Sequence, residues 1–377
     1  MEELRIRIYN VEFGDAIFLS IPEADGRTVR VLIDFGNALL KGGDDAALLA
    51  VAEDLERELG GQPLDLYIMT HEHMDHVQGP LLASTRFRLS ALNVWMTASS
   101  EPDYYTSGKF PEAKKKRLAA MAAYAGIAAF ADRTAAPEPV QAVLAINNPR
   151  ASRDCVDFIA GLGRTPPLYL HRTASVEGRH PFVETAVRVL APEQDTSVYY
   201  GRLQPATMAL APDGWAAATA RDTGLVPPAG VAAGDFFDLV AFRANGMAAN
   251  LRTIDKAANN SSVVIELEWR GWRLLFPGDA EEKSWEIMDR LGLLQPVHFL
   301  KVSHHGSKNG SPMQQIDTLM PAVSPDGKRR VCVVSTAVGA YPGVPDDATL
   351  ELLAARSELH DTRDVPAGRW HDVVFKG

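Results

Sequence analysis

The sequence lacks several features that would assign the protein to a specialised class. No apolar run approaches the roughly 18 residues that a membrane-spanning helix needs. The two cysteines, Cys155 and Cys332, are too few for a disulfide framework or a cysteine metal cluster, and the apolar run around Cys332 is typical of a buried thiol. The segment from Met1 to Arg5 lacks the basic and apolar regions of a signal peptide. We therefore expect a cytoplasmic protein that does not contact a membrane.

Positive charge is scarce as well. Lys and Arg number 38 against 48 Asp and Glu, which gives a net charge of −10. An acidic surface disfavours broad, non-specific binding to nucleic acid. It does not exclude a phosphate group in a pocket, because bound divalent cations would dominate the local field. The 377 residues are 46% hydrophobic and 23% charged, as in an ordinary globular protein with one large domain or two smaller ones.

Hydrophobic periodicity predicts both strands and helices along the chain. Residues 4–9 alternate between apolar and other side chains, which is the period of a half-buried strand. The turn dipeptide Asp25-Gly26 separates the apolar runs over 16–21 and 29–33, so these runs predict a hairpin. Further strands are expected over 66–69, 91–96, 187–190, 263–269, 272–276, 297–302, 331–335 and, more weakly, 365–375, and helices over 44–59, 77–82, 112–131, 282–291 and 347–357.

The middle of the chain carries the least information. Residues 200–250 are rich in Ala, Gly and Pro and are too poor in large apolar side chains to build a core of their own. We interpret this stretch as part of an insertion or lid at about 100–255, within a single domain over 1–377. Such a segment often sets the choice of substrate.

The most informative stretch follows the predicted strand Leu66–Met69. His71, His73, Asp75 and His76 come within six residues directly after it. The His-x-His pair puts two imidazoles on one side of an extended turn, where both can reach one cation, while the adjacent Asp75 and His76 diverge toward a second. Imidazole nitrogen suits Zn²⁺, and carboxylate oxygen also suits harder ions such as Mn²⁺. The helical zinc-protease motif His-Glu-x-x-His does not fit, because the position four after His71 is Asp75.

Other side chains of the metal-binding type also follow predicted strands. Asp34 and Asp279 each end a predicted hairpin, and His304-His305 follows the strand over 297–302. Loops at the carboxyl ends of strands converge in layered α/β folds, so we expect these side chains to meet. Each aspartate alone is also explained by the turn preference of this residue, and the interpretation therefore depends on the combination.

The combination resembles the metallo-β-lactamase-fold hydrolases. The order of motifs along the chain is similar to that of the hydrolase domain of the competence-channel (DNA uptake) group, and more distantly to phosphorylcholine esterases. The matching motifs are Gly14-Asp15-Ala16, Thr-His-x-His-x-Asp-His over 70–76, Asn-Ser over 260–261, Gly-Asp over 278–279, His-His-Gly-Ser over 304–307 and the segment from Ser335 to Pro342. The resemblance implies an α/β (α+β) fold in the form of a four-layer αβ/βα sandwich. It also implies two divalent metal ions on one edge, with Zn²⁺ favoured over Mn²⁺.

The resemblance also implies roles for individual residues. It assigns the first metal to His71 and His73, the second to Asp75 and His76, and a bridging role to Asp279. Strand alternation would point the rings of His304 and His305 to opposite sides, so only one of them is expected to bind the second ion. The small residue that follows it favours His305 as this ligand. Asp75 and His304 are then the predicted catalytic residues, with His304 as proton donor. Asp34 is expected to orient the His loop. The candidates for contacting the substrate are Asn260, Ser307, Lys308 and Tyr341.

One departure from the family concerns the first metal. Its members commonly have a third histidine shortly before the Gly-Asp strand, whereas this chain has Ala258-Asn259-Asn260 there. Water, Asn259, Asn260 or a distant histidine such as His171 or His180 remain alternatives for completing the site. His171, His180, His298, His360 and His371 are otherwise interpreted as ordinary surface or core histidines.

The expected function is that of a metal-dependent hydrolase. We expect a phosphodiesterase or nuclease-like enzyme, in which a hydroxide held by two metal ions attacks phosphorus in a small-molecule or nucleic-acid phosphoester. Hydrolysis of a carboxylic ester, lactone or thioester is the alternative within enzymes, and the missing third histidine counts against it. A non-catalytic, metal-stabilised binding or accessory protein is the alternative outside enzymes.

Overall fold

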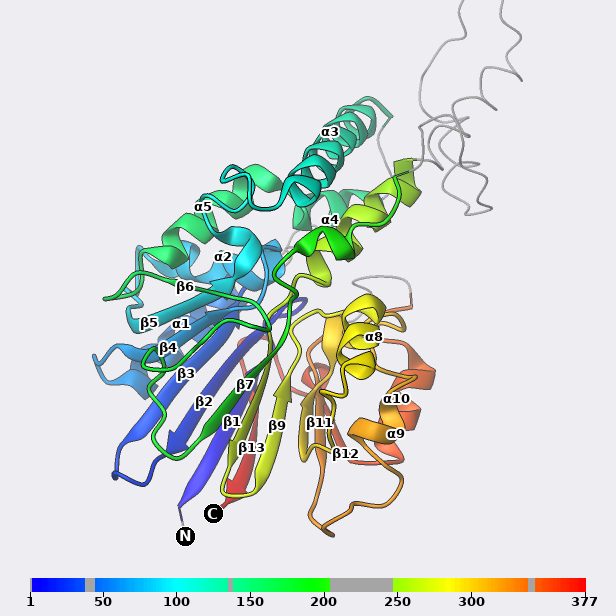
Figure 1. The fold of residues 1–377 in the computed structure, drawn as a ribbon. Helices are drawn as coiled ribbons and strands as arrows, with labels where there is room; N and C mark the ends of the chain where they lie inside the picture. Colours follow the sequence, from blue (N-terminus) through cyan, green and yellow to red (C-terminus); the bar gives the residue numbers. More distant parts are fainter. Residues whose placement is uncertain (1, 38–44, 135–137, 204–246, 338–342) are drawn as a thin grey trace, which may run out of the picture. The chain divides into compact units, whose positions relative to one another are not determined.

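The computed structural model describes residues 2–37, 45–134, 138–203, 247–337 and 343–377, and the side chains over 132–139 are not described. Two mixed β-sheets form its centre (Figure 1). The first has the strand order β13-β1-β2-β3-β4-β5-β6 and the second the order β12-β11-β10-β9-β8-β7. The strands of the first sheet are β1 Glu3–Tyr9, β2 Ala16–Pro22, β3 Thr28–Phe35, β4 Leu64–Met69, β5 Ala91–Thr97, β6 Leu168–Leu170 and β13 Trp370–Lys376. Those of the second are β7 Ala186–Ala191, β8 Val264–Trp269, β9 Trp272–Phe276, β10 Phe299–Lys301, β11 Val331–Val334 and β12 Glu358–Asp361.

Both sheets follow the same plan. Antiparallel strands lie at one side, β13-β1-β2-β3 in the first sheet and β7-β8-β9 in the second. The strands from β3 to β6 and from β9 to β12 pair in parallel. Parallel neighbours end at the same edge, so the loops after β3, β4, β9 and β10 are brought to the carboxyl edges of their sheets.

Alternation along the strands divides the core into three apolar clusters. In β2, Ile17 and Leu19 enter a cluster to which both sheets contribute, whereas Phe18 enters a second cluster with α1 and α2. A third cluster joins β8–β11 to α8 and α10. Helices therefore cover the outer face of each sheet (Figure 1), and the predicted layered α/β fold is confirmed. These helices are α1 Ala46–Leu59, α2 Met74–Ala83, α5 Pro149–Ala160, α8 Glu282–Arg290, α9 Ile316–Leu319 and α10 Asp347–Ala354.

Most predicted elements agree with the structure to within a few residues. The sequence interpretation missed the helices α5, α9 and α4 Glu138–Ile146 and the short strands β6 and β12, which lie in stretches with weak periodicity. Cys332 is buried, as predicted from the apolar run around it. In the part of the chain that the structure describes, no helix combines the length and the apolar character needed to cross a membrane.

The chain divides into two compact units. The first contains both sheets and comprises Met1–Tyr104, Asn148–Gln194 and Ala258–Gly377, and the second comprises Tyr105–Asn147 and Asp195–Ala257. The second unit includes α3 Pro111–Thr134 and α4 Glu138–Ile146 and has a small apolar cluster formed by Ile127, Met247 and Leu251. The range predicted as an insertion or lid, about 100–255, thus covers the second unit and also 148–194 of the first. Its role as a lid stays a prediction, and 204–246 lie outside the described residues.

Candidate metal centre

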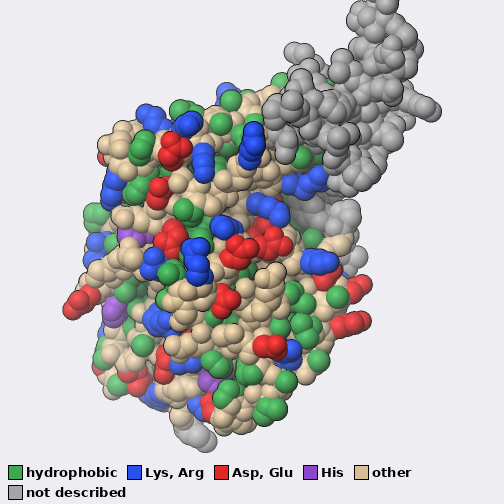
Figure 2. All heavy atoms as spheres, turned by 45° about the vertical axis from the view of Figure 1, so that its right-hand side comes forward, with side chains coloured by type: hydrophobic (Ala, Val, Ile, Leu, Met, Phe, Trp, Pro, Cys, Tyr) green, Lys and Arg blue, Asp and Glu red, His purple; other side chains and the backbone are tan. Residues whose placement is uncertain are grey.

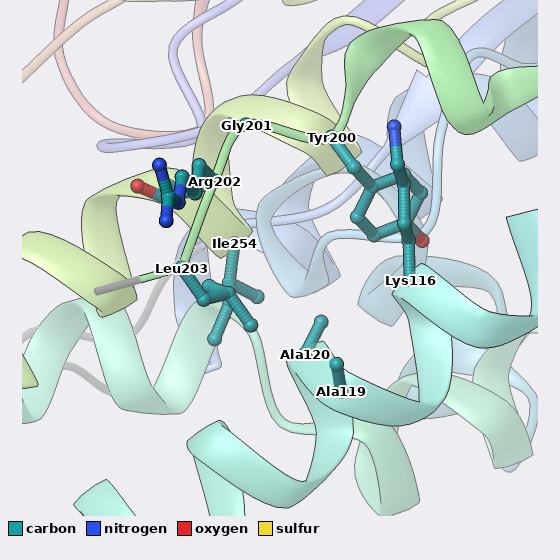
Figure 3. A pocket seen from close by; sticks show the side chains of 9 residues that line it. Lys116, Ala119, Ala120, Tyr200, Gly201, Arg202, Leu203 and Ile254 are labelled. Carbon is teal, nitrogen blue, oxygen red and sulfur yellow. The ribbon is translucent and has the colours of Figure 1, made fainter. Parts of the chain in front are cut away.

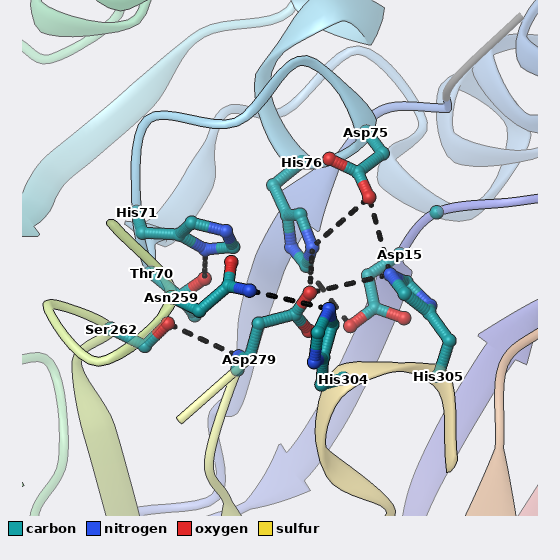
Figure 4. Close-up of polar contacts among 12 residues, drawn as sticks. Asp15, Thr70, His71, Asp75, His76, Asn259, Ser262, Asp279, His304 and His305 are labelled. Atoms are coloured by element: carbon teal, nitrogen blue, oxygen red, sulfur yellow. Dashed lines mark hydrogen bonds and ion pairs between the residues drawn. The ribbon is translucent and has the colours of Figure 1, made fainter. Parts of the chain in front are cut away.

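The centre is formed where three strands of the first unit end. Asp75 and His76 lie in the first turn of α2, after β4, while Asp279 follows β9 and His305 follows β10. Their ligand-type atoms all lie within 4.8 Å of one another, and all four side chains are buried. His305 Nε2 lies 3.2 Å from Asp75 Oδ2 and 3.3 Å from Asp279 Oδ2, and His76 Nε2 lies 3.2 Å from Asp279 Oδ2 (Figure 4). Two carboxylates and two imidazoles thus face one point.

Close backbone contacts hold these loops against one another. Gly278 precedes Asp279 with φ +54, and a Cβ added there would lie 2.8 Å from Cβ of Thr70. Gly36 lies directly against the backbone of Asp75 and His76, where an added Cβ would be 2.7 Å from both Asp75 C and His76 N. Only glycine permits this approach, so the convergence of the loops is set by local sequence.

Asp34 connects the end of β3 to the His loop. Its Oδ1 accepts a hydrogen bond from Thr70 N at 2.7 Å, and its Oδ2 accepts from Thr70 Oγ1 at 2.6 Å. His76 Nδ1 lies 2.8 Å from the same Oδ2. Asp34 has a left-handed backbone with φ +53, an uncommon conformation for a residue other than glycine. This strain fits a position where contacts to the His loop outweigh local preference.

These hydrogen bonds fix which ring nitrogen of each histidine faces the centre. Because the Thr70 hydroxyl donates to Asp34, it must accept from His71 Nδ1, 3.1 Å away. His76 donates from Nδ1 to Asp34, and His305 donates from Nδ1 to the carbonyl oxygen of Ser335 at 2.9 Å. In all three rings Nε2 is therefore the atom left to face a cation, as in known metal sites.

His71 and His73 lie beside this group. The ring of His71 is 4.7 Å from that of His73 and 4.2 Å from that of His76, measured between centroids. Among the described residues, neither His71 nor His73 belongs to a group of three or more residues whose ligand-type atoms all lie within 4.8 Å of one another. The six predicted metal ligands thus lie close together. The site predicted around Asp75 and His76 has four donors, because Asp279 and His305 join it, whereas His71 and His73 lie beside this group.

The centre carries excess negative charge. Asp15, Asp34, Asp75 and Asp279 are all buried, and the buried ammonium of Lys301 pairs with Asp15. Burial opposes charge on His305, but Asp279 and Asp75 outweigh it and raise the pKa of this imidazole to about 9. The same balance raises the pKa of His76 well above its usual range. Conversely, burial and the neighbouring rings of His76 and His73 lower the pKa of His71, which stays neutral. Protons or a divalent cation can supply the missing positive charge.

Several buried polar atoms support a cation as the natural occupant. In the described part of the chain, His71 Nε2, Asp75 Oδ1 and Asp279 Oδ1 have no hydrogen-bond partner. A buried polar atom without a partner costs free energy, on the order of 1–3 kcal/mol. Imidazole nitrogens with carboxylate oxygens form a donor set that suits Zn²⁺ or Mn²⁺. The residues present therefore fit a divalent metal ion.

His304 and His305 do not alternate along a strand, as the sequence interpretation assumed. Both have left-handed backbones, with φ +46 and +53, and Gly306 follows with φ +79. This turn directs His305 into the four-donor group, while His304, with 20% of its side chain exposed, remains outside it. His304 instead contacts Asn259, Glu281 and Ser307.

The candidate substrate contacts are placed less favourably. Asn260 and Ser307 are buried and already bonded, Asn260 Oδ1 to Ser284 N at 2.8 Å and Ser307 Oγ to Gly310 N at 3.1 Å. Lys308 is exposed, and Tyr341 lies outside the described residues. None of the remaining histidines, His171, His180, His298, His360 and His371, belongs to a ligand group among the described residues.

Three contributors were not predicted from the sequence. Asp15, Lys301 and Glu281 are buried charged residues, of which Glu281 contacts His304 and the other two form an ion pair. Asp15 lies in the motif Gly14-Asp15-Ala16, and Glu281 follows Asp279 by two positions, so the local sequence pointed to both residues. Lys301 lies inside an apolar strand, where a buried lysine requires a partner, and this signal points to a missing carboxylate.

A separate cavity lies within the second unit (Figure 3). It has a volume of about 400 Å³ and is largely apolar, with Ala119, Ala120, Leu203 and Ile254 in its wall. Lys116 also contributes, but its ammonium already donates to the carbonyl oxygen of Ser197 at 2.8 Å. No predicted site residue lines this cavity.

The raised pKa of His305 predicts a pH dependence for the metal-free protein. The ordinary pKa is 6.5 and the folded value about 9, so the contribution of this group to stability is complete below pH 6.5 and is lost as pH rises through 9. After chelation, the free energy of unfolding in urea should fall over this window by on the order of 3 kcal/mol. A metal ion must displace the proton of His305, so metal affinity should increase as pH rises from 6.5 to 9.

The matched control is His360→Gln, which removes a half-exposed histidine outside the centre and should leave both pH profiles unchanged. Equal stability of the chelated protein at pH 6.5 and 9 would contradict the raised pKa of His305.

Comparison with known proteins adds no family assignment. No protein-family model matches the sequence, and a search of curated proteins found no match.

Proposed function

We propose that the protein is a metal-dependent hydrolase and that its substrate is a phosphodiester. The observation that carries the proposal is the buried group of Asp75, His76, Asp279 and His305, with His71 and His73 beside it. Divalent cations bound there would activate water and neutralise charge on the oxygens of the substrate. Two cations are the proposed content, with Zn²⁺ favoured over Mn²⁺.

The residues of the chain have distinct parts in this proposal. Asp34 holds the His loop through Thr70 and His76 and keeps the ring of His76 in one orientation. Asp279 contacts both His76 and His305 and so links the loops after β4, β9 and β10. His304 lies at the edge of the group and is partly exposed, which makes it the candidate for passing a proton to the leaving group.

The choice of a phosphodiester rests on the resemblance of the motifs and on the charge of the chain. On the face in Figure 2, acidic and basic side chains are interspersed rather than gathered by sign. With a net charge of −10, such a surface favours a small phosphoester, or a short nucleic-acid end, over a long polyanion. Hydrolysis of a carboxylic ester, lactone or thioester is the competing proposal within enzymes.

The test is hydrolysis of bis(p-nitrophenyl) phosphate by purified protein with added Zn²⁺ or Mn²⁺. Activity should appear with metal and disappear with chelator. Asp75→Asn and His76→Ala should each lower the rate by about a hundredfold or more, because each removes a donor from the four-donor group. Asp326→Asn, an exposed aspartate paired with His298, is the matched control and should retain full activity.

Retained activity in both Asp75→Asn and His76→Ala would rule out the proposal. A parallel panel with a p-nitrophenyl carboxylic ester, a lactone and a thioester identifies the competing enzyme class. If metal analysis finds bound metal but no substrate is cleaved, the protein is instead a metal-stabilised binding protein.

A further inference from the structure

We propose that the side-chain oxygen of Asn259 is the third protein ligand of the cation held by His71 and His73. This inference rests on the metal centre of the proposed function, but not on catalysis. It selects one residue among the alternatives that the sequence left open. The argument starts from Glu281, which fixes the orientation of the Asn259 amide.

Glu281 is a buried carboxylate with its own set of donors. Its side chain is 1% exposed. Its Oε1 accepts a hydrogen bond from Asn259 Nδ2 at 2.8 Å, and its Oε2 accepts from Asn309 Nδ2 at 2.5 Å. A carboxylate oxygen can only accept, so the atom of Asn259 that faces Glu281 must be the NH₂ group.

His304 contacts the same NH₂ group. Its Nε2 lies 3.2 Å from Asn259 Nδ2. Because an amide NH₂ can only donate, this Nε2 must be the unprotonated nitrogen, and the proton resides on Nδ1. Nδ1 lies 2.9 Å from Ser307 Oγ and 3.3 Å from Glu281 Oε1, both of which can accept it. The contact to Glu281 therefore imposes the orientation of the Asn259 amide, and the contact to His304 agrees with it.

This orientation directs the amide oxygen away from Glu281 and His304. Figure 4 shows the oxygen of Asn259 on the side of the His71 ring, while its nitrogen points to His304. His71 Nε2 is the ring atom that faces the centre, and no hydrogen bond to it occurs within the described residues. Asn259 is itself buried, so its oxygen lies in a protected position next to the first predicted metal.

The neighbouring asparagine is committed to a structural role. Asn260 Oδ1 accepts a hydrogen bond from Ser284 N at 2.8 Å, and its carbonyl oxygen accepts from Ser284 Oγ at 2.8 Å. Both bonds are to the first turn of α8, where unpaired N–H groups need an acceptor. Asn260 therefore holds the start of this helix, and Asn259 is the residue that faces His71.

A carboxamide oxygen changes the metal preference of the first site. Compared with a third imidazole, it is a harder and weaker donor, which suits Mn²⁺ better than Zn²⁺. The two sites should therefore differ in affinity, and the site with His71, His73 and Asn259 should release its ion first. Replacement of Asn259 by histidine should restore a three-imidazole site that prefers Zn²⁺.

The test is equilibrium dialysis of the full-length protein against Mn²⁺ or Zn²⁺ at pH 7.5, with bound metal counted by plasma emission. The wild type should bind two ions with separable affinities. Asn259→Ala should weaken binding of the ion at the site with His71 and His73 by about tenfold or more and leave the other ion unchanged. Asn259→His should bind two Zn²⁺ more tightly than the wild type does. Asn93→Ala, which removes another half-buried asparagine that donates to Asp65 O, is the control.

Glu281→Gln provides a variant that keeps the volume of the side chain and tests the orienting step. One terminal atom of glutamine is an NH₂ group, which cannot accept, so the glutamine could accept a hydrogen bond from only one of the Asn259 and Asn309 amides through its oxygen. The Mn²⁺ affinity of the site with His71 and His73 should therefore fall several-fold. A wild type that binds only one ion, or an Asn259→Ala protein that binds both ions as tightly as the wild type, would overturn the proposal. These outcomes are separate from those for function: two ions without hydrolysis would remove the enzyme and leave Asn259 as a ligand.

Discussion

Replacing Asp279 by asparagine should remove bound metal and lower phosphodiester hydrolysis by on the order of a thousandfold or more. Asp279 Oδ2 lies within 3.3 Å of both His76 Nε2 and His305 Nε2. Its pKa is held well below the usual range, because the two imidazoles outweigh the effect of burial, and it is therefore ionised at any working pH. Asparagine keeps the shape but removes the charge and one anionic oxygen. Metal content by plasma emission and the initial rate are the two measurements.

A third measurement on the same variant separates loss of metal from loss of fold. In the metal-free protein, the pKa of His305 should move from about 9 toward its ordinary value, because Asp279 is the carboxylate that raises it most. A pH titration of the histidine ring signals by NMR measures this shift, and dispersed spectra show that the fold persists. Asp326→Asn again serves as the control, because Asp326 lies at an exposed ion pair. Full metal content in Asp279→Asn would contradict the assignment.

The parts of the centre that could be predicted from the sequence are those encoded within one loop. His71, His73, Asp75 and His76 lie within six residues after an apolar strand, and their spacing alone indicates a metal site. Asp279 was predictable because it ends a hairpin in the same way as Asp34. Parallel strands present their carboxyl ends at one edge, which brings the loops after β9 and β10 together. The loop after β4 belongs to the other sheet, and it meets them because the two sheets pack face to face on a shared apolar cluster.

The remaining features depend on contacts between distant segments. Lys301 and Asp15 are 286 positions apart, and neither residue alone identifies the other as its partner. The turn at His304 was misinterpreted because strand alternation was extended beyond β10, whereas the chain enters a left-handed conformation there. Periodicity describes side chains inside an element and cannot predict the backbone where an element ends. The role of Glu281 is likewise visible only once Asn259 and Asn309 are placed around it.

Replacing Lys301 by methionine should destabilise the protein by about 3–5 kcal/mol. Lys301 is 1% exposed and its ammonium pairs with Asp15 Oδ2, while Asp15 Oδ1 has no hydrogen-bond partner in the described part of the chain. Asp15 N donates to the carbonyl oxygen of Asp75 at 3.0 Å, so the pair also supports the loop that carries two candidate ligands. Methionine preserves most of the volume and leaves a buried carboxylate without its counter-ion. Urea unfolding of the chelated protein at pH 7 measures the loss.

The double variant Asp15→Asn with Lys301→Met identifies the cause of that loss. If the cost arises from the unpaired charge, removing both charges should cost less than the sum of the single variants, by at least about 1 kcal/mol. Lys328→Met removes a half-exposed lysine whose ammonium lies 3.8 Å from Asp326, and this control should change stability by less than about 1 kcal/mol. Additive effects of Asp15→Asn and Lys301→Met would mean that the two charges do not stabilise each other. The buried pair would then be a consequence of packing between β2 and β10 rather than a contact that holds the Asp75 loop in place.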